Sequence, residues 1–128
     1  MVWSPEVIGE YRCFGGVQGY YRHASRAIGL PMQYSLYRPP GTPRGLLLCL
    51  AGLTCSEETF PIKAGAQRLA SALGLALLSP DTSPRGTNIP GQADDWGFGA
   101  AAGFYLDATQ APWATHWRME SHVMQELL

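Results

Sequence analysis

Residues 46–60 read LLLCLAGLTCSEETF, an apolar run that passes through a glycine into small polar and acidic side chains. A short continuous apolar run without alternation is typical of a strand buried on both faces in a parallel sheet. The short length and the flanking glycines favour a strand over a helix for residues 46–52. The polar segment after it indicates either an ordinary loop of a packed α/β core or an active site at the carboxyl end of a strand.

A helical pattern and a second apolar strand follow this stretch. Residues 60–74 carry apolar side chains at spacings of three and four, namely Ile62, Ala66, Leu69, Ala70 and Leu73. Gly74 supplies a helix stop, and residues 75–80 (LALLSP) read as another fully apolar strand. The order strand, helix, strand predicts a βαβ unit with parallel strands and a right-handed crossover.

The remaining chain divides into two strands, a long loop and a last helix. Residues 15–24 and 31–38 are expected to be strands, the second with an alternating apolar face. Residues 80–112 are rich in glycine, proline and aspartate, and a loop of this length is uncommon unless it is functional or disordered. Its aromatic side chains argue against disorder. Residues 113–128 read as a helix, with Pro112 near its start.

Composition excludes several classes of protein. A chain of 128 residues is expected to form one domain, and a net charge of -1 excludes a basic nucleic-acid surface. The apolar stretches are far shorter than the roughly 20 residues that cross a bilayer. The N-terminus lacks the pattern of a signal peptide. Three cysteines without CxxC spacing argue against disulfides or a zinc site. These features predict a cytoplasmic protein without metal, membrane or nucleic-acid partners.

From Phe14 onward, long strings match one enzyme family in order and spacing. They are LAGLTCSEETF, KAGAQRLA, PDTSPRG, GAAAGFYLDATQAPW and HWRMESHVMQEL. The chain thereby resembles the S-formylglutathione hydrolase family, also called esterase D. The resemblance implies an α/β-hydrolase that cleaves S-formylglutathione to formate and glutathione in formaldehyde detoxification. It also implies a Ser-Asp-His triad, no metal or cofactor, a cytoplasmic location and a possible homodimer of the full-length form.

One departure from the family is large. The sequence has no GxSxG, the elbow that carries the nucleophile, and in α/β-hydrolases the aspartate and the histidine follow that serine. We therefore expect residues 1–128 to be the N-terminal segment of a single α/β-hydrolase domain. This segment would hold part of a mostly parallel sheet with flanking helices, would lack the triad and would be inactive alone. Smaller departures are Val17, Gly97 and residues 100–102, where the family more often holds Trp, Asp and Gly-Thr-Gly.

The resemblance implies that Leu53 contributes its backbone N–H to the oxyanion hole. In α/β-hydrolases one oxyanion-hole N–H comes from the loop after the third strand, and Gly52-Leu53-Thr54 occupies that loop here. The resemblance places Thr54, Cys55 and Trp96 along the pocket. An ordinary strand-to-helix turn at Leu53, a small buried side chain at Cys55 and simple packing at Trp96 are the structural alternatives.

Other chemistry-bearing residues have simpler interpretations. Cys55 as a nucleophile would need a base, and no Cys-His or CxxC motif supplies one locally. In the α/β-hydrolase order the triad histidine follows the nucleophile in the sequence, so none of the three histidines qualifies as the triad base. His116 and His122 are six residues apart, a spacing that does not place a pair of metal ligands on one face of a helix. Asp81 and Arg85 are expected to pair and shape their loop.

Asp107 is expected to help start the last helix.

The rival to an enzyme segment is a non-catalytic product, either a truncated gene or an interaction module. Coding DNA beyond Leu128 distinguishes them, because a continuing frame with a GHSMGG-like elbow marks an enzyme.

Overall fold

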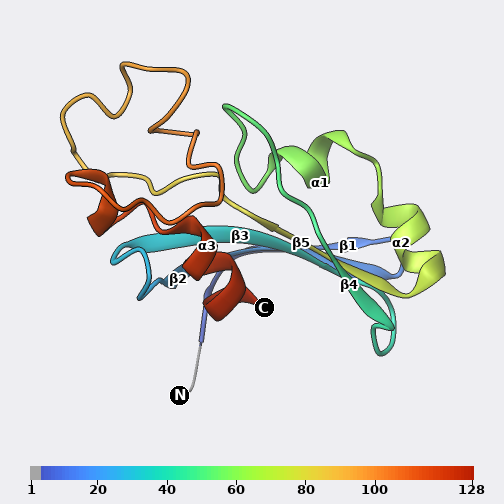
Figure 1. Ribbon diagram of the computed structural model, residues 1–128. Coiled ribbons are helices and arrows are strands. Elements are labelled where there is room, and N and C mark those ends of the chain that lie inside the picture. The colour runs from blue at the N-terminus through green and yellow to red at the C-terminus, as the bar shows by residue number, and fades with distance from the viewer. Residues whose placement is uncertain (1–3) are drawn as a thin grey trace.

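The computed structural model describes residues 4–128, and all of its named strands belong to one sheet with helices on both faces (Figure 1). The strand order is β1-β2-β3-β5-β4. The strands are β1 (Glu6–Cys13), β2 (Gly16–Ala24), β3 (Pro31–Arg38), β4 (Gly45–Leu48) and β5 (Leu75–Pro80). The helices are α1 (Thr59–Lys63), α2 (Gln67–Leu73), α3 (Met119–Ser121), the 3-10 turn η1 (Trp113–Thr115) and the π-helical η2 (His122–Leu127). Within the described residues, no helix combines the length and the apolar character that crossing a membrane requires.

The βαβ prediction is confirmed. β4 and β5 pair in parallel, with α1 and α2 between them in sequence, and β2, β3 and β5 match the predicted strands. The other pairings in the described sheet are antiparallel, so in this chain the parallel character is confined to β4 and β5. β1 was not predicted. Its apolar side chains are exposed and do not alternate with buried ones, so it carries no period-two signal.

The prediction of a doubly buried strand over residues 46–52 is wrong in extent and burial. β4 ends at Leu48, although Cys49 N still donates to Leu78 O at 2.8 Å. β4 lies at the edge of the described sheet and pairs only with β5. Leu46 and Leu47 are therefore 47% and 49% exposed. An apolar edge strand whose outer side is unpaired in this way is a template for further strand pairing.

The single helix predicted for residues 60–74 is two helices. Gly65 adopts a left-handed φ of 63°, which ends one helix before the next begins. This break changes which side chains face the sheet: Ile62 and Leu69 are more than 60% exposed. Gln67, which is not one of the predicted apolar positions, is buried and donates to Pro61 O at 2.8 Å. Gly74 stops the second helix in a left-handed conformation, as predicted.

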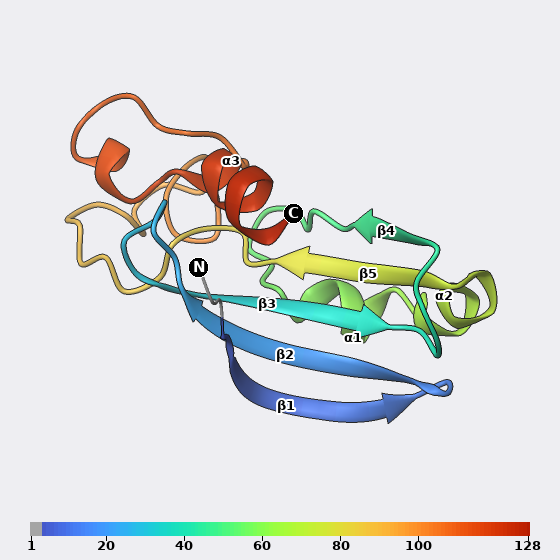
Figure 2. The ribbon, with the colours of Figure 1, turned by 90° about the horizontal axis from the view of Figure 1, so that it is seen from below.

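Two hydrophobic clusters sandwich the centre of the sheet. On one face Leu77 packs with Tyr37, Cys49 and Ala70 of α2, and Phe60 of α1 packs against them. On the other face its neighbour Leu78 packs with Tyr21 and Tyr34, where Leu127 of η2 joins them. Adjacent residues of a strand point to opposite faces, so β5 contributes to both clusters. Figure 2 shows β5 between β3 and β4, with the C-terminal helices at its carboxyl end.

The helix predicted for residues 113–128 is interrupted around Trp117. Trp117 is fully buried, its Nε1 donates to Gly99 O at 3.2 Å, and its carbonyl accepts from Ala108 N at 2.7 Å. These tertiary contacts take Trp117 out of the helical pattern. Asp107 accepts hydrogen bonds from Ser121 N at 3.0 Å and Ser121 Oγ at 2.5 Å. Asp107 thus binds the first turn of α3 and not the start that was predicted near Pro112, and the N-cap residue of α3 is Arg118.

Candidate functional site

Two loops meet at the carboxyl ends of β4 and β5. Because these strands are parallel, the segment after Leu48 and the segment after Pro80 leave the sheet at the same edge, as Figure 1 shows. In open α/β sheets, ligands bind outside the carboxyl ends of the strands. The sequence stretch that ends in polar side chains therefore lies where such a site is built.

A tight turn presents the backbone of Leu53. Cys55 N donates to Gly52 O at 3.2 Å, which closes a four-residue turn. Thr54, at the third position, has a φ of 65°, whereas Leu53 is not among the described residues with positive φ. This combination defines a type II turn with Leu53 at its second position. Among the hydrogen bonds of residues 4–128, none uses Leu53 N–H as a donor. That N–H is therefore available to an oxygen of a ligand.

The residues after β5 hold this turn in place. Thr82 Oγ1 donates to Cys55 O at 2.6 Å, and Arg85 Nη2 donates to the same carbonyl at 3.2 Å. On the other side of the turn, Thr54 N donates to Ala101 O at 3.1 Å. Ala101 N in turn donates to Ser83 Oγ at 2.8 Å. The Leu53 turn is thus fixed from two sides by the segment that follows β5.

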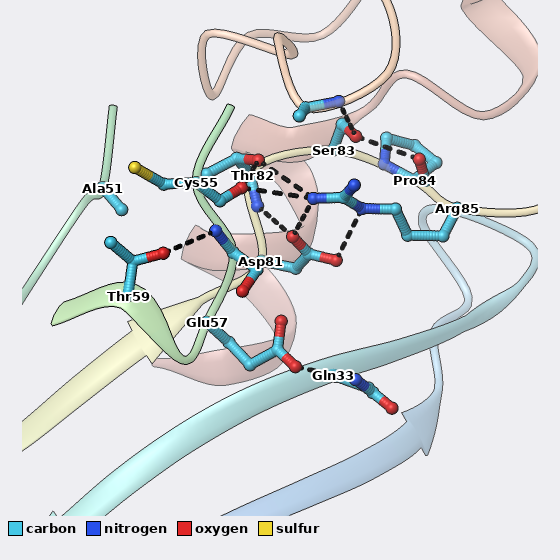
Figure 3. A network of polar contacts seen from close by, with 12 residues as sticks. Gln33, Ala51, Cys55, Glu57, Thr59, Asp81, Thr82, Ser83, Pro84 and Arg85 are labelled. Atoms are coloured by element: carbon cyan, nitrogen blue, oxygen red, sulfur yellow. Dashed lines mark hydrogen bonds and ion pairs between the residues drawn. The ribbon is translucent and has the colours of Figure 1, made fainter. Parts of the chain in front are cut away.

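Asp81 is the buried anchor of these contacts (Figure 3). It is only 3% exposed, and its carboxylate accepts from Arg85 Nε at 3.0 Å, from Arg85 Nη2 at 2.8 Å and from Thr82 N at 2.7 Å. The predicted pairing of Asp81 with Arg85 is confirmed. Hydrogen bonding to Asp81 raises the pKa of Arg85, so the guanidinium stays charged throughout the accessible pH range.

Glu57 and Tyr105 also belong to the site, although sequence reasoning did not single them out. Glu57 is buried, and its side chain accepts from Gln33 Nε2 at 2.7 Å while its carbonyl accepts from Ser35 Oγ at 2.8 Å. Burial, and then the nearby charge of Asp81, raises the pKa of Glu57. The Tyr105 hydroxyl donates to Ala51 O at 2.8 Å. Partners far along the chain fix both side chains, and no local motif marks them.

Two cavities flank the Leu53 turn. The Tyr105 cavity has a volume of about 210 Å³ and is lined by residues 51–53, Thr82 and residues 101–105. The Trp96 cavity has a volume of about 180 Å³ and is lined by Leu53, Thr54, Ala93, Asp95, Trp96 and Ala100. Leu53 lines both cavities, and Thr54 and Trp96 join it in the second. Cys55 lines neither; its carbonyl is held by Thr82 and Arg85, and its thiol is partly buried.

Strained backbone is concentrated at this place. Six non-glycine residues of the described chain have positive φ, and four of them lie around the Leu53 turn and the Tyr105 cavity. These four are Thr54, Ala101, Phe104 and Tyr105, with φ between 53° and 65°. Such conformations cost about 1–3 kcal/mol each and cluster at ligand sites and active sites. Their positions provide evidence for function that is independent of the family strings.

A second polar cluster contains the residue types of a hydrolase triad in a different geometry. Ser25 Oγ lies 3.3 Å and Glu126 Oε2 lies 2.9 Å from the same nitrogen of His122, Nδ1. A triad requires the hydroxyl and the carboxylate on opposite nitrogens of the imidazole. Glu126 also accepts from Arg26 N at 2.6 Å and from Ala27 N at 2.9 Å. This cluster fastens η2 to the β2–β3 connection and is not arranged for nucleophilic catalysis.

The same cluster brings together three ligand-type side chains. One ligand atom each from His23, His122 and Glu126 lies within 4.8 Å of the others. The two imidazoles are stacked, with centroids 5.2 Å apart and planes at 15°. Because imidazole lone pairs lie in the ring plane, stacked rings do not direct them at one point. The cluster is therefore not arranged as a converging set of metal ligands, and burial lowers the pKa values of both histidines.

Solved structures of known proteins share this architecture. The chain superposes on an S-formylglutathione hydrolase from Agrobacterium tumefaciens with a TM-score of 0.90 and 41% identity, covering 95% of this chain and 45% of that one. An S-formylglutathione hydrolase from Staphylococcus aureus shares the fold more distantly. Its TM-score is 0.51 at 15% identity, over 85% of this chain and 41% of that one. The five-stranded sheet with its helices is therefore part of an α/β-hydrolase fold.

Sequence comparisons define the family more narrowly. The family model described as "Putative esterase" matches residues 22–128, so the chain belongs to this esterase family. It is 47% identical over 130 residues to the S-formylglutathione hydrolase of Paracoccus denitrificans (strain Pd 1222), a match that covers 99% of this chain and 46% of that protein. The chain thus spans less than half the length of this relative. The hydrolase relatives favour an enzyme segment over a non-catalytic interaction module.

Proposed function

We propose that residues 1–128 form the N-terminal segment of a single α/β-hydrolase domain whose complete form hydrolyses S-formylglutathione. The observation that carries the proposal is the Leu53 N–H, which lacks an intramolecular acceptor among the described residues and lies on a turn between two cavities. The absence of GxSxG from the sequence supports a nucleophile that lies outside these residues. The segment then contributes half of an oxyanion hole and one wall of the substrate pocket.

In the complete enzyme, a serine hydroxyl attacks the thioester carbonyl while a histidine takes its proton. The carbonyl oxygen becomes an oxyanion, to which Leu53 N–H donates a hydrogen bond. Collapse of this intermediate breaks the carbon–sulfur bond, and the protonated histidine returns the proton to the glutathione sulfur. Water then attacks the formyl-serine ester in the same way, releases formate and restores the serine. Each such oxyanion donor contributes about 2.7–4 kcal/mol to the transition state.

The two cavities divide the substrate between them. The Tyr105 cavity can receive the formyl group, because most of its lining residues are alanine, glycine or threonine. Thr54 and Trp96 border the other cavity, on the path that the glutathione part would take, and Cys55, the last residue of the turn, lines neither cavity. The chemistry uses side chains and water and requires neither a metal nor an organic cofactor. Formaldehyde catabolism in the cytoplasm and a homodimer of the complete enzyme belong to the same proposal.

The test is to complete the domain. The joined protein consists of residues 1–128 followed by the part of the Paracoccus denitrificans relative that lies beyond the matched region. We expect the joined protein to release formate from S-formylglutathione and the 128-residue chain to be inactive. If the chain alone turns over substrate, and this turnover survives Cys55→Ala, the proposed division of the site is wrong.

A further inference from the structure

The carbonyl of Cys55 receives two hydrogen bonds although it is not part of a strand or helix. Thr82 Oγ1 donates at 2.6 Å and Arg85 Nη2 at 3.2 Å (Figure 3). Cys55 is the last residue of the type II turn, and its N–H closes that turn onto Gly52 O. Holding the Cys55 carbonyl therefore fixes the direction in which the turn presents Leu53 N–H.

Arg85 is able to hold this carbonyl because Asp81 holds Arg85. Asp81 is 5% exposed at its side chain and directly follows β5, so it moves with the sheet. Arg85 is 45% exposed at its side chain, yet two of its nitrogens bind the Asp81 carboxylate at 3.0 and 2.8 Å. The guanidinium thus links the rigid centre of the sheet to a loop carbonyl.

The geometry requires an arginine. Nη2 contacts Asp81 Oδ1 and Cys55 O and lies 3.4 Å from Thr82 Oγ1, while Nε contacts Asp81 Oδ2. A planar guanidinium offers five donors in a fixed fork, whereas a lysine offers a single ammonium on a flexible stem. Lysine would keep the charge beside Asp81 but could not hold both partners in the same geometry. Arg85 lines neither the Tyr105 cavity nor the Trp96 cavity.

We propose that Arg85 is a positioning residue for the oxyanion hole, acting through Asp81 and the Cys55 carbonyl on Leu53 N–H. The inference rests on the proposed function, because it needs an oxyanion at Leu53. Arg85 lines neither of the two cavities, so its loss should affect the transition state rather than substrate binding. Small displacements of a catalytic group lower the rate by up to about 100-fold.

The experiment measures kcat and KM for S-formylglutathione in the joined protein with Arg85→Gln, Arg85→Lys and Arg38→Gln. Arg38 is the matched control, because it is 49% exposed and pairs with Glu10 at 3.2 Å on the sheet, away from the Leu53 turn. We expect Arg85→Gln to lower kcat about 10- to 100-fold with KM within about twofold. Arg85→Lys should recover only part of kcat, and Arg38→Gln should leave both constants unchanged.

Thr82→Val provides a second variant if Arg85→Gln does not fold. It removes only the hydroxyl that donates to Cys55 O, in a side chain of similar shape, and should also lower kcat without raising KM. An active joined protein in which folded Arg85→Gln or Thr82→Val matches Arg38→Gln overturns the positioning role. A folded joined protein without any hydrolysis overturns the proposed function instead, so the two failures are distinguishable.

Discussion

Replacing Leu53 by proline removes one hydrogen-bond donor and the leucine side chain, and it leaves the turn intact. Leu53 occupies the second position of a type II turn, where proline's fixed φ of about −65° matches the backbone and where proline is common. The preceding residue is Gly52, which tolerates the restriction that proline places on its neighbour. No intramolecular hydrogen bond of the described chain uses Leu53 N–H, so none is lost. Proline at a compatible site usually stabilises a protein by about 0.4–1 kcal/mol.

The expected loss of activity follows from the same geometry. If Leu53 N–H is one of two oxyanion donors, Leu53→Pro lowers kcat by about 10²- to 10³-fold, equivalent to about 2.7–4 kcal/mol. Because the Leu53 side chain lines both cavities, Leu53→Ala is the matched control, as it loses the side chain but keeps the N–H. Its effect should fall mainly on KM.

The assay is steady-state hydrolysis of S-formylglutathione by the joined protein, with thermal melts of each variant. Leu53→Pro should melt at or above the temperature of the parent, which separates loss of the donor from loss of the fold. A Leu53→Pro protein that folds and turns over within about threefold of Leu53→Ala would refute the assignment of the oxyanion donor, since a lost donor costs far more.

Three further predictions concern stability and association. Burial lowers the pKa of His122 from 6.5, so the unfolded state takes up a proton first and stability should fall as pH drops below 6.5. His122→Gln in the joined protein should flatten that part of the curve of melting temperature against pH. A slope equal to that of the parent protein would contradict this. Trp117 is fully buried, so Trp117→Ala should cost about 3–5 kcal/mol in a urea titration. Trp96→Ala, at a side chain that is 74% exposed, should stay within about 0.5 kcal/mol, and similar losses for both would be the contrary result. Leu46→Lys on the outer edge of β4 should reduce self-association of the 128-residue chain in sedimentation runs. The control Leu69→Lys, at an exposed position of α2, should reduce self-association less. A larger reduction with Leu69→Lys than with Leu46→Lys would exclude edge pairing as the cause.

The parts of the fold that sequence predicted are those with strong local signals. The apolar runs of β4 and β5 and the helix stop at Gly74 follow from residue type and spacing alone. The break at Gly65 was missed because an apolar period of three and four continues across it. Apolar spacing also predicted a helix through Trp117. In the structure Trp117 is buried and donates to Gly99 O, and it lies between two helical segments.

The candidate site was predictable only in part. Asp81 and Arg85 lie four residues apart in one loop, so their pairing was visible in the sequence. The oxyanion role of Leu53 came from the family strings, because no residue type marks a backbone N–H. Glu57 depends on Gln33, 24 residues away, and Tyr105 on Ala51, 54 residues away. Contacts of this range depend on the folded topology and leave no local pattern.

Formate release from S-formylglutathione by the joined protein tests the central proposal most directly. We expect turnover in the joined protein, strong loss with Leu53→Pro, and none in residues 1–128 alone. A joined protein that folds cooperatively yet releases no formate would contradict the assignment of this chain to the oxyanion side of an S-formylglutathione hydrolase.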